Sequence, residues 1–365
     1  MAADDAAPAA VPDRTAALAE RLFRSSLAAL ELYTIYLGDR LGLYRALRAG
    51  GPTTSAELAE RTGTAERYAR EWLEQQAAGG LLDVENPGAE AHARRYRLPA
   101  EHVPVLADRD DVHFQAHTGV DIVRAGRRLP QLVDAFRTGQ APPPLAWGPE
   151  GRAEANRARF LNLLGSQWLP AIRDVDARLR AEPPARVADL ACGTGWSSIA
   201  MGLAYLRIAV TGVDLDPDAI AAAERNAVQA GVADRVTFSV TDASALGGSG
   251  SYQLVTIFEA LHDMSRPVDA LRAARDLLAR GGTVLVADAL VQDEFTAPAP
   301  ERDRHEYGWS VVSCLPGAMG DPRTAATGAV LRASVLRRYA AEAGFAQVQV
   351  LPIRTDYWRF YRLDR

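Results

Sequence analysis

The pattern of apolar and polar positions changes near residue 183 and predicts two kinds of structure in one chain. Residues 14–48 hold no proline, and their leucines recur at mostly helical spacing. From residue 186 onward, short β-branched runs alternate with alanine-rich stretches, which is typical of βα units in a parallel, doubly wound α/β sheet. The expected strands are 187–191, 208–214, 236–241, 252–258, 283–287 and 346–351, and the expected helices lie near 196–205, 217–230, 267–279 and 331–343.

The residues after 50 have the outline of a winged helix-turn-helix. Thr54 and Glu57 have the spacing of a capping box, and Thr64 is expected to cap the helix that follows. Two short strands of a wing are predicted next, at 81–84 and 94–98.

A winged helix often binds DNA, but the charge of this one is unfavourable for that role. Its second helix carries more acid than base, in the set Glu66, Arg67, Arg70, Glu71 and Glu74. Acidic side chains facing a polyanion weaken binding, so a domain for dimerisation and for covering an active site is the preferred interpretation.

The chain is expected to divide into four segments. Residues 1–13 are expected to form a disordered tail, since they lack the apolar stretch of a signal peptide. Residues 14–104 are expected to form the winged-helix-like dimerisation domain. A mostly helical linker and cover is expected over 105–182, and the α/β domain over 183–365. Within that domain, the long segment 290–330 is an insertion that is expected to form part of a lid and of the substrate wall.

Composition excludes several classes of protein. No apolar run approaches the ~18 residues of a membrane span, which indicates a cytoplasmic protein, and a net charge of −5 without a basic run gives no footprint for nucleic acid. All 41 basic residues are arginine, so Schiff-base and Walker-type lysine chemistry are excluded. Cys192 and Cys314 form no CxxC pair, and we expect reduced, buried thiols with no disulfide and no metal.

The strongest chemical signal is the loop after the first expected strand of the α/β domain. Gly193 and Gly195 follow that strand and open a helix, so the backbone there can approach a ligand closely. Asp214 ends the second strand, where its carboxylate can accept hydrogen bonds from ribose hydroxyls.

Acidic residues at the strand ends predict that the ligand is cationic. Asp189 stands directly before the loop, where it would repel a pyrophosphate and attract an ammonium or a sulfonium group. Asp242 ends the third strand and is placed to accept a hydrogen bond from an adenine amino group, and the amide of Ala243 could donate to the ring.

The segments DLACGTG, GVDLD, VTDA and RGGTVLVAD together resemble the ordered motifs of class I S-adenosylmethionine-dependent methyltransferases over about residues 186–290. The resemblance implies a mainly parallel, seven-stranded Rossmann-like sheet with S-adenosylmethionine as cofactor. The cofactor residues it implies are Asp189, Ala191, Gly193, Gly195, Asp214, Leu215, Asp242, Ala243 and Phe258. Ala191 replaces the family's first glycine, which is tolerable if its φ is negative and otherwise tightens the turn.

The fourth strand ends in Phe258-Glu-Ala-Leu-His-Asp-Met, which puts Glu259 and His262 at the mouth of the same crevice as candidate catalytic residues. The LHD tripeptide is similar to the LHDW segment of small-molecule O-methyltransferases that carry an N-terminal winged-helix dimerisation domain, and that resemblance implies a base role for His262 and a homodimer. Met264 stands where the family has tryptophan. The alternative is a structural His262 that orders the loop, its ring bonded by Glu259 or by backbone.

Aromatic residues are the candidates for the substrate side. Trp147, Tyr307 and Trp309 could contact a substrate or the sulfonium by cation–π attraction, or could simply pack in the core or lid. Three functions stay open at this point. The first is methyl transfer to an oxygen or nitrogen of a small, apolar metabolite; the second is cyclisation of the cofactor with release of methylthioadenosine; the third is a non-catalytic regulator that senses the cofactor.

Overall fold

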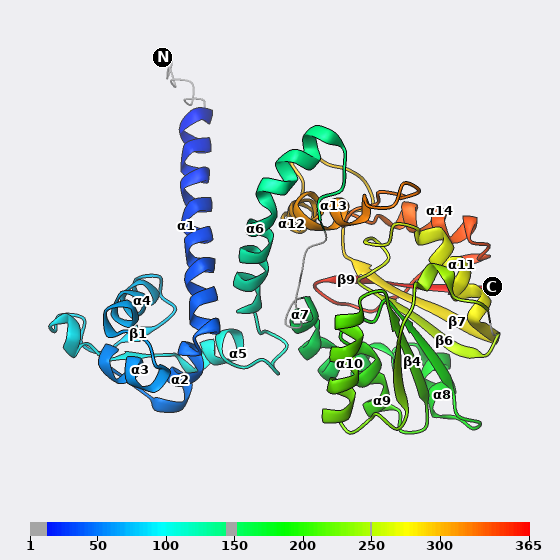
Figure 1. Cartoon of the computed structure of the whole chain (residues 1–365), viewed down its shortest axis with the longest axis horizontal. Coiled ribbons are helices and arrows are strands. Elements are labelled where there is room, and N and C mark those ends of the chain that lie inside the picture. Colours follow the sequence, from blue (N-terminus) through cyan, green and yellow to red (C-terminus); the bar gives the residue numbers. More distant parts are fainter. Residues whose placement is uncertain (1–12, 144–151, 249) are drawn as a thin grey trace, which may run out of the picture. The chain divides into compact units, whose positions relative to one another are not determined.

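The computed structural model describes residues 13–143, 152–248 and 250–365, and the chain divides into two compact units (Figure 1). The first unit comprises Met1–Asp108 with His113–Val123, and the second comprises Arg109–Val112 with Arg124–Arg365. Most of the helical segment expected as a separate cover therefore belongs to the second unit. The expected disordered tail lies outside the described residues, apart from Asp13.

The first unit is helical with a small wing. Its elements are α1 (Arg14–Arg40), α2 (Leu43–Gly50), α3 (Ser55–Thr62), α4 (Glu66–Ala78), β1 (Asp83–Val84), β2 (Tyr96–Arg97) and α5 (Val103–Leu106). β1 and β2 pair antiparallel, so the predicted wing is confirmed. The capping box is confirmed as well, because the Thr54 hydroxyl accepts from the Glu57 amide while the Glu57 carboxylate accepts from the Thr54 amide. The predicted cap at Thr64 is wrong, since Ala65 occupies that position without a side-chain bond.

A buried cluster holds the end of α1 against α2 and α4. Trp72 packs edge-on against Tyr44 with ring centroids 5.2 Å apart, and its indole Nε1 donates to the Thr34 carbonyl at 2.9 Å. Tyr44 in turn donates to the Gln76 side chain. The buried residues of α1 are confined to Ile35, Gly38 and Asp39, so its N-terminal half gains no packing from its own unit.

The second unit is built on a seven-stranded sheet, which confirms the predicted fold class. The strand order is β5-β4-β3-β6-β7-β9-β8, and all neighbours are parallel except at β9, which is antiparallel to both its partners. The strands are β3 (Arg186–Leu190), β4 (Ala209–Asp214), β5 (Val236–Val240), β6 (Tyr252–Phe258), β7 (Leu278–Ala289), β8 (Gln347–Val350) and β9 (Trp358–Asp364). No strand was predicted at β9, which the two long-range pairings with β7 and β8 define.

Helices cover both faces of this sheet (Figure 1). From residue 117 onward the α-helices are α6 (His117–Thr138), α7 (Arg152–Arg159), α8 (Arg173–Arg180), α9 (Trp196–Ala204), α10 (Pro217–Gln229), α11 (Pro267–Leu277), α12 (Glu301–Trp309), α13 (Leu315–Ala318) and α14 (Ala333–Glu342). A π-helical segment, Phe160–Trp168, continues α7. Leu254 and Val255, adjacent on β6, belong to separate apolar clusters on the two faces, as expected for a parallel strand buried on both sides.

The order of the strands locates the ligand crevice. From β3 the chain moves outward through β4 and β5, and it then returns to place β6 and β7 on the other side of β3. The carboxyl ends of β3 and β6 therefore flank a topological switch point, where open α/β sheets bind their ligands. None of the described helices is both long and apolar enough to cross a membrane.

Candidate active site

Acidic residues lie at the carboxyl ends of five neighbouring strands. They are Asp189 on β3, Asp214 on β4, Asp242 after β5, Glu259 after β6 and Asp288 on β7. Parallel strands bring these ends to one edge of the sheet, and the sequence predicted four of the five as site residues.

The loop after β3 bends through an alanine in a conformation that favours glycine. Ala191 has a φ of 56°. An alanine in place of the family's glycine is tolerable only at a negative φ, so the turn here is tight. A left-handed conformation costs an L-residue about 1–2 kcal/mol. The strain sits directly beside the two glycines of the predicted cofactor loop, where strained backbone commonly marks function.

The two glycines of the loop serve different purposes. A Cβ added at Gly193, with a φ of 54°, would meet nothing within 4 Å, so this residue leaves open space for a ligand against the backbone. A Cβ at Gly195 would come within 2.6 Å of the Phe238 ring, so this glycine allows α9 to pack on the sheet. The Gly193 amide also donates to Asp214 at 2.9 Å, which ties the loop to β4. The loop therefore fits a ligand that approaches the main chain closely.

Asp189 is more deeply buried than the sequence suggested. Its carboxylate accepts from three hydroxyls, those of Ser197, Ser198 and Thr256, each at 2.6 Å. Burial raises the pKa of Asp189, and the three hydrogen bonds oppose that rise. The carboxylate thus faces the protein interior and orders the loop from beneath.

Asp242 is held in a fixed orientation at the end of β5. One carboxylate oxygen accepts from the amide and hydroxyl of Ser244, and the other accepts from Arg266 at 2.6 Å. Burial would raise the pKa of Asp242, but the bonds from Ser244 and the charge of Arg266 prevail and lower it. The group is therefore an anion that can accept from an adenine amino group.

The apolar residues expected near the cofactor differ in exposure. Leu215, directly after β4, is 68% exposed and offers its side chain to a ligand. Ala243 is buried. Phe258 packs inside the unit, with its ring centroid 5.6 Å from that of Phe160 in the π-helical segment.

His262 is buried between carboxylates from two elements. Its Nδ1 lies 2.7 Å from Asp288 on β7, and its Nε2 lies 3.4 Å from Asp263. The thiol of Cys314 is the third neighbour of the ring. Burial alone would lower the pKa of His262, but the two carboxylates outweigh it and hold the pKa well above its usual value. The arrangement keeps the imidazole in one orientation and favours its protonated form.

Glu259 adopts a φ of 51°, a second strained residue at the same edge of the sheet. The side-chain amide of Asn156, on α7, donates to its carboxylate. The sequence alternative in which Glu259 or the backbone bonds the His262 ring differs from the structure, where Asp288 forms the hydrogen bond to Nδ1 and Asp263 lies within ion-pair distance of Nε2.

The three aromatic residues expected on the substrate side are Trp147, Tyr307 and Trp309. Trp147 lies outside the described residues. Tyr307 accepts from Arg332 at 3.1 Å, and Trp309 donates to His305 at 3.0 Å, so both side chains bond to neighbours of the insertion. The insertion reaches His262 through Cys314, which is a free, buried thiol as predicted.

Sequence reasoning therefore missed Asp288, Asn156 and Cys314. Asp288 ends the quoted segment RGGTVLVAD, so its strand-end position was a usable signal. Asn156 and Cys314 lie in helical segments with no motif, and only the fold brings them to the site.

Comparison with known proteins identifies the chain. Residues 187–282, which run from β3 through the glycine loop and into β7, match the family described as "Methyltransferase domain". Through this domain the protein is an S-adenosylmethionine-dependent methyltransferase. In this methyltransferase, residues 28–108 match the family "Rv2258c-like winged HTH domain", which covers most of the first unit. The open backbone at Gly193 and the strand-end acids fit S-adenosylmethionine as the cofactor.

Named proteins resemble this chain in sequence or in fold. The ubiquinone biosynthesis O-methyltransferase of Burkholderia pseudomallei (strain 1710b) is 26% identical to the methyltransferase over 214 residues, 56% of this chain and 79% of that protein. The solved human N-acetylserotonin methyltransferase in complex with SAM has a TM-score of 0.72 at 17% identity, over 98% of this chain and 99% of that one. A putative O-methyltransferase from Nostoc punctiforme PCC 73102 has a TM-score of 0.64 at 20% identity, over 98% and 100%.

Proposed function

We propose that the enzyme transfers the methyl group of S-adenosylmethionine to an oxygen of a small metabolite, with His262 as the general base. The observation that carries this proposal is the position of His262, buried between Asp288 and Asp263 at the ligand end of the sheet. The names of the Burkholderia and Nostoc relatives, which are O-methyltransferases, favour oxygen over nitrogen as the acceptor atom.

The residues divide the chemistry in a simple way. The bound cofactor supplies an electrophilic methyl group, and the protein must align the acceptor and remove its proton. Asp288 fixes the tautomer of His262 through Nδ1 and stabilises the imidazolium that forms when Nε2 takes the proton. Proton removal of this kind contributes roughly 10²- to 10⁴-fold to the rate, while alignment of the reacting atoms supplies the larger part.

Replacement of the base tests the proposal. We expect His262→Ala to bind S-adenosylhomocysteine as the wild type does, while turnover with a panel of phenols falls at least about 100-fold, because the proton acceptor is lost. Calorimetry measures the binding, and mass spectrometry measures S-adenosylhomocysteine formed from S-adenosylmethionine. Unchanged turnover would refute the base role. Detection of methylthioadenosine as the product would show that the enzyme cyclises the cofactor and does not transfer its methyl group.

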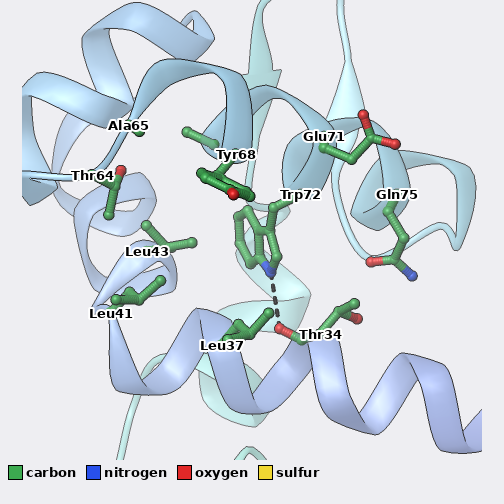
Figure 2. Close-up of a pocket in the computed structure, with 11 residues that line it drawn as sticks. Thr34, Leu37, Leu41, Leu43, Thr64, Ala65, Tyr68, Glu71, Trp72 and Gln75 are labelled. Atoms are coloured by element: carbon green, nitrogen blue, oxygen red, sulfur yellow. Dashed lines mark hydrogen bonds between the residues drawn. The ribbon is translucent and has the colours of Figure 1, made fainter.

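The winged-helix domain is proposed as a dimerisation domain. Large apolar side chains are exposed over about half of the circumference of the N-terminal part of α1, namely Leu18, Leu22, Phe23, Leu27 and Leu30. The same side of α1 continues into a groove of about 620 Å³ between α1 and α4, lined by Leu37, Leu41, Tyr68 and Trp72 among others (Figure 2). A helix without packing partners is marginal in water, so a second copy of this chain is the proposed occupant.

The regulator alternative finds no support in the charges of α4. Arg67 pairs with Glu71, and Arg70 pairs with Glu66, both within the helix. Paired arginines offer little free charge to a phosphate backbone. We therefore propose an enzyme that uses its winged helix for assembly.

A further inference from the structure

Two arginines from distant segments share one aromatic ring in the second unit. Arg159 ends α7, Arg302 lies on α12 of the insertion, and Tyr357 precedes β9. The guanidinium carbon of Arg159 lies 3.7 Å from the centroid of the Tyr357 ring, and that of Arg302 lies 5.0 Å from it. The fold thus gathers two positive charges at a single point.

Arg159 is a buried cation without a counter-ion. Its exposed fraction is 8%, its Nε has no hydrogen-bond partner, and its Nη1 donates to the side-chain oxygen of Asn156 at 3.1 Å. Within the described part of the chain, no carboxylate lies within ion-pair distance of Arg159 or Arg302. By contrast, the nearby Arg157 and Arg332 pair with Asp110 and Asp303.

A buried charge of this kind is costly unless something compensates it. The tyrosine face provides partial compensation, since cation–π attraction is worth only about 1–2 kcal/mol. A guanidinium also presents a planar fork of donors that matches a carboxylate in a two-bond geometry. The free Nε therefore points to an anionic partner that is not part of the protein.

The position of Arg159 connects it to the active site. Asn156 accepts from Arg159 and donates to Glu259, and Glu259 directly follows β6 at the ligand end of the sheet. The side chain of Asn156 thus bridges Arg159 and Glu259, which lies three residues before His262.

We propose that Arg159, together with Arg302, binds a carboxylate group of a ligand in the active site. This proposal rests on the proposed function, because the ligand is one of its two substrates. The carboxylate belongs either to the amino-acid end of the cofactor or to a methyl acceptor that carries an acid group. Because Arg302 lies on the insertion, the bound carboxylate would also link α12 to α7.

The first experiment tests the cofactor as the source. S-adenosylhomocysteine and its decarboxylated analogue are titrated by calorimetry into the wild type, Arg159→Gln and Arg302→Gln. If the cofactor supplies the carboxylate, Arg159→Gln weakens the binding of S-adenosylhomocysteine roughly 10-fold or more, because a charge-assisted hydrogen bond is lost. The affinity for the decarboxylated analogue should then change by no more than about twofold. Arg304→Gln, at an exposed position of the same helix α12, is the control for Arg302→Gln and should change neither.

The second experiment tests the acceptor as the source. The probes are 2-naphthoate and the neutral 2-naphthamide, titrated into each variant saturated with S-adenosylhomocysteine. If the acceptor supplies the carboxylate, Arg159→Gln leaves the affinity for S-adenosylhomocysteine unchanged and selectively weakens naphthoate by about 10-fold or more. Arg159→Lys, which retains the charge without the planar fork, should restore part of the loss.

The proposal is overturned if Arg159→Gln and Arg302→Gln leave the affinities for S-adenosylhomocysteine and 2-naphthoate unchanged. It is also overturned if they weaken each of these ligands by the same factor as its counterpart without the carboxylate. If the thermal melt of Arg159→Gln shows that this variant does not fold, the same titrations of Arg302→Gln test the proposal. Wild-type protein that binds S-adenosylhomocysteine with no effect of either substitution would leave the proposed function intact and remove only the carboxylate subsite. Wild-type protein that fails to bind S-adenosylhomocysteine would contradict the proposed function itself.

Discussion

Of the three non-glycine residues with a positive φ in the described part of the chain, two lie at the ligand end of the sheet. Ala191 and Glu259 both have positive φ values, and they follow β3 and β6, the two strands that flank the switch point. Strained residues persist only where the surrounding structure enforces them, so their position supports a functional role for this edge.

The strain at Ala191 can be measured directly. We expect Ala191→Gly to raise the free energy of unfolding by up to about 1 kcal/mol, because glycine adopts the left-handed conformation without the steric cost and loses only part of this gain to unfolded-chain entropy. Urea denaturation followed by circular dichroism provides the measurement. Gly195→Ala is the opposite control and should destabilise, since its Cβ would clash with Phe238 and Ala223. A destabilised Ala191→Gly would show that the turn is not strained.

The carboxylates around His262 predict a shift in the pH dependence of activity. The base must be neutral, so kcat/KM should rise with pH through the raised pKa of His262. Asp263→Asn removes a negative charge beside Nε2, which lowers that pKa, and the acidic limb should therefore move to lower pH. A pH profile of kcat/KM measures the shift.

The control for this profile is Asp234→Asn, an exposed carboxylate that pairs with Arg235 beside β5. Its pH profile should match that of the wild type. An acidic limb that stays in place or moves to higher pH in Asp263→Asn would contradict the assignment of the limb to His262.

At the scale of elements, local sequence signals were reliable where one side chain acts on its own helix. The capping box of α3 formed as its residue spacing predicted. The cap expected for α4 shifted by one residue, because Ala65 takes the extended conformation that precedes the helix. Thr64 instead places its hydroxyl 3.0 Å from that of Thr62.

The difference between the two threonines can be tested as a pair. Thr54→Ala should cost about 1 kcal/mol of unfolding free energy, because the Glu57 amide loses its acceptor. Thr64→Ala should cost distinctly less, since it caps no helix. Denaturant midpoints of the two variants provide the comparison. Equal losses would contradict the assignment of the caps.

At the scale of the whole molecule, the N-terminal half of α1 is the feature that a single chain leaves unexplained. Its large apolar side chains occupy about half of the helix circumference, and the described residues of its own unit do not bury them. The helix is therefore expected to be completed by assembly.

A charge on that side of α1 should disrupt the dimer. We expect Leu22→Glu to give a monomer, because it places a carboxylate in an apolar interface. Light scattering after size-exclusion chromatography measures the mass in solution. Ala28→Glu, on the opposite side of the helix, adds the same charge and should leave the dimer intact. A wild-type monomer would overturn the proposed assembly.

The sequence by itself determined the features that depend on residues close together in the chain. Alternating βα patterns predicted the doubly wound sheet, and the loop between Gly193 and Gly195, with acids at successive strand ends, predicted a cationic nucleoside cofactor. These signals are readable because a strand, its loop and the next helix are consecutive, and the parallel sheet brings every strand end to one edge.

Only the tertiary structure decided which groups meet across long separations. It surrounded His262 with Asp288 and Cys314, turned Asp189 toward three hydroxyls, and placed Arg159 and Arg302 on the ring of Tyr357. The cover helix and the insertion carry no motif, because their roles arise from packing against distant strands. The carboxylates gathered around the buried histidine set its protonation, and the packing around Arg159 buries its charge without a carboxylate beside it. Both arrangements are properties of the folded whole.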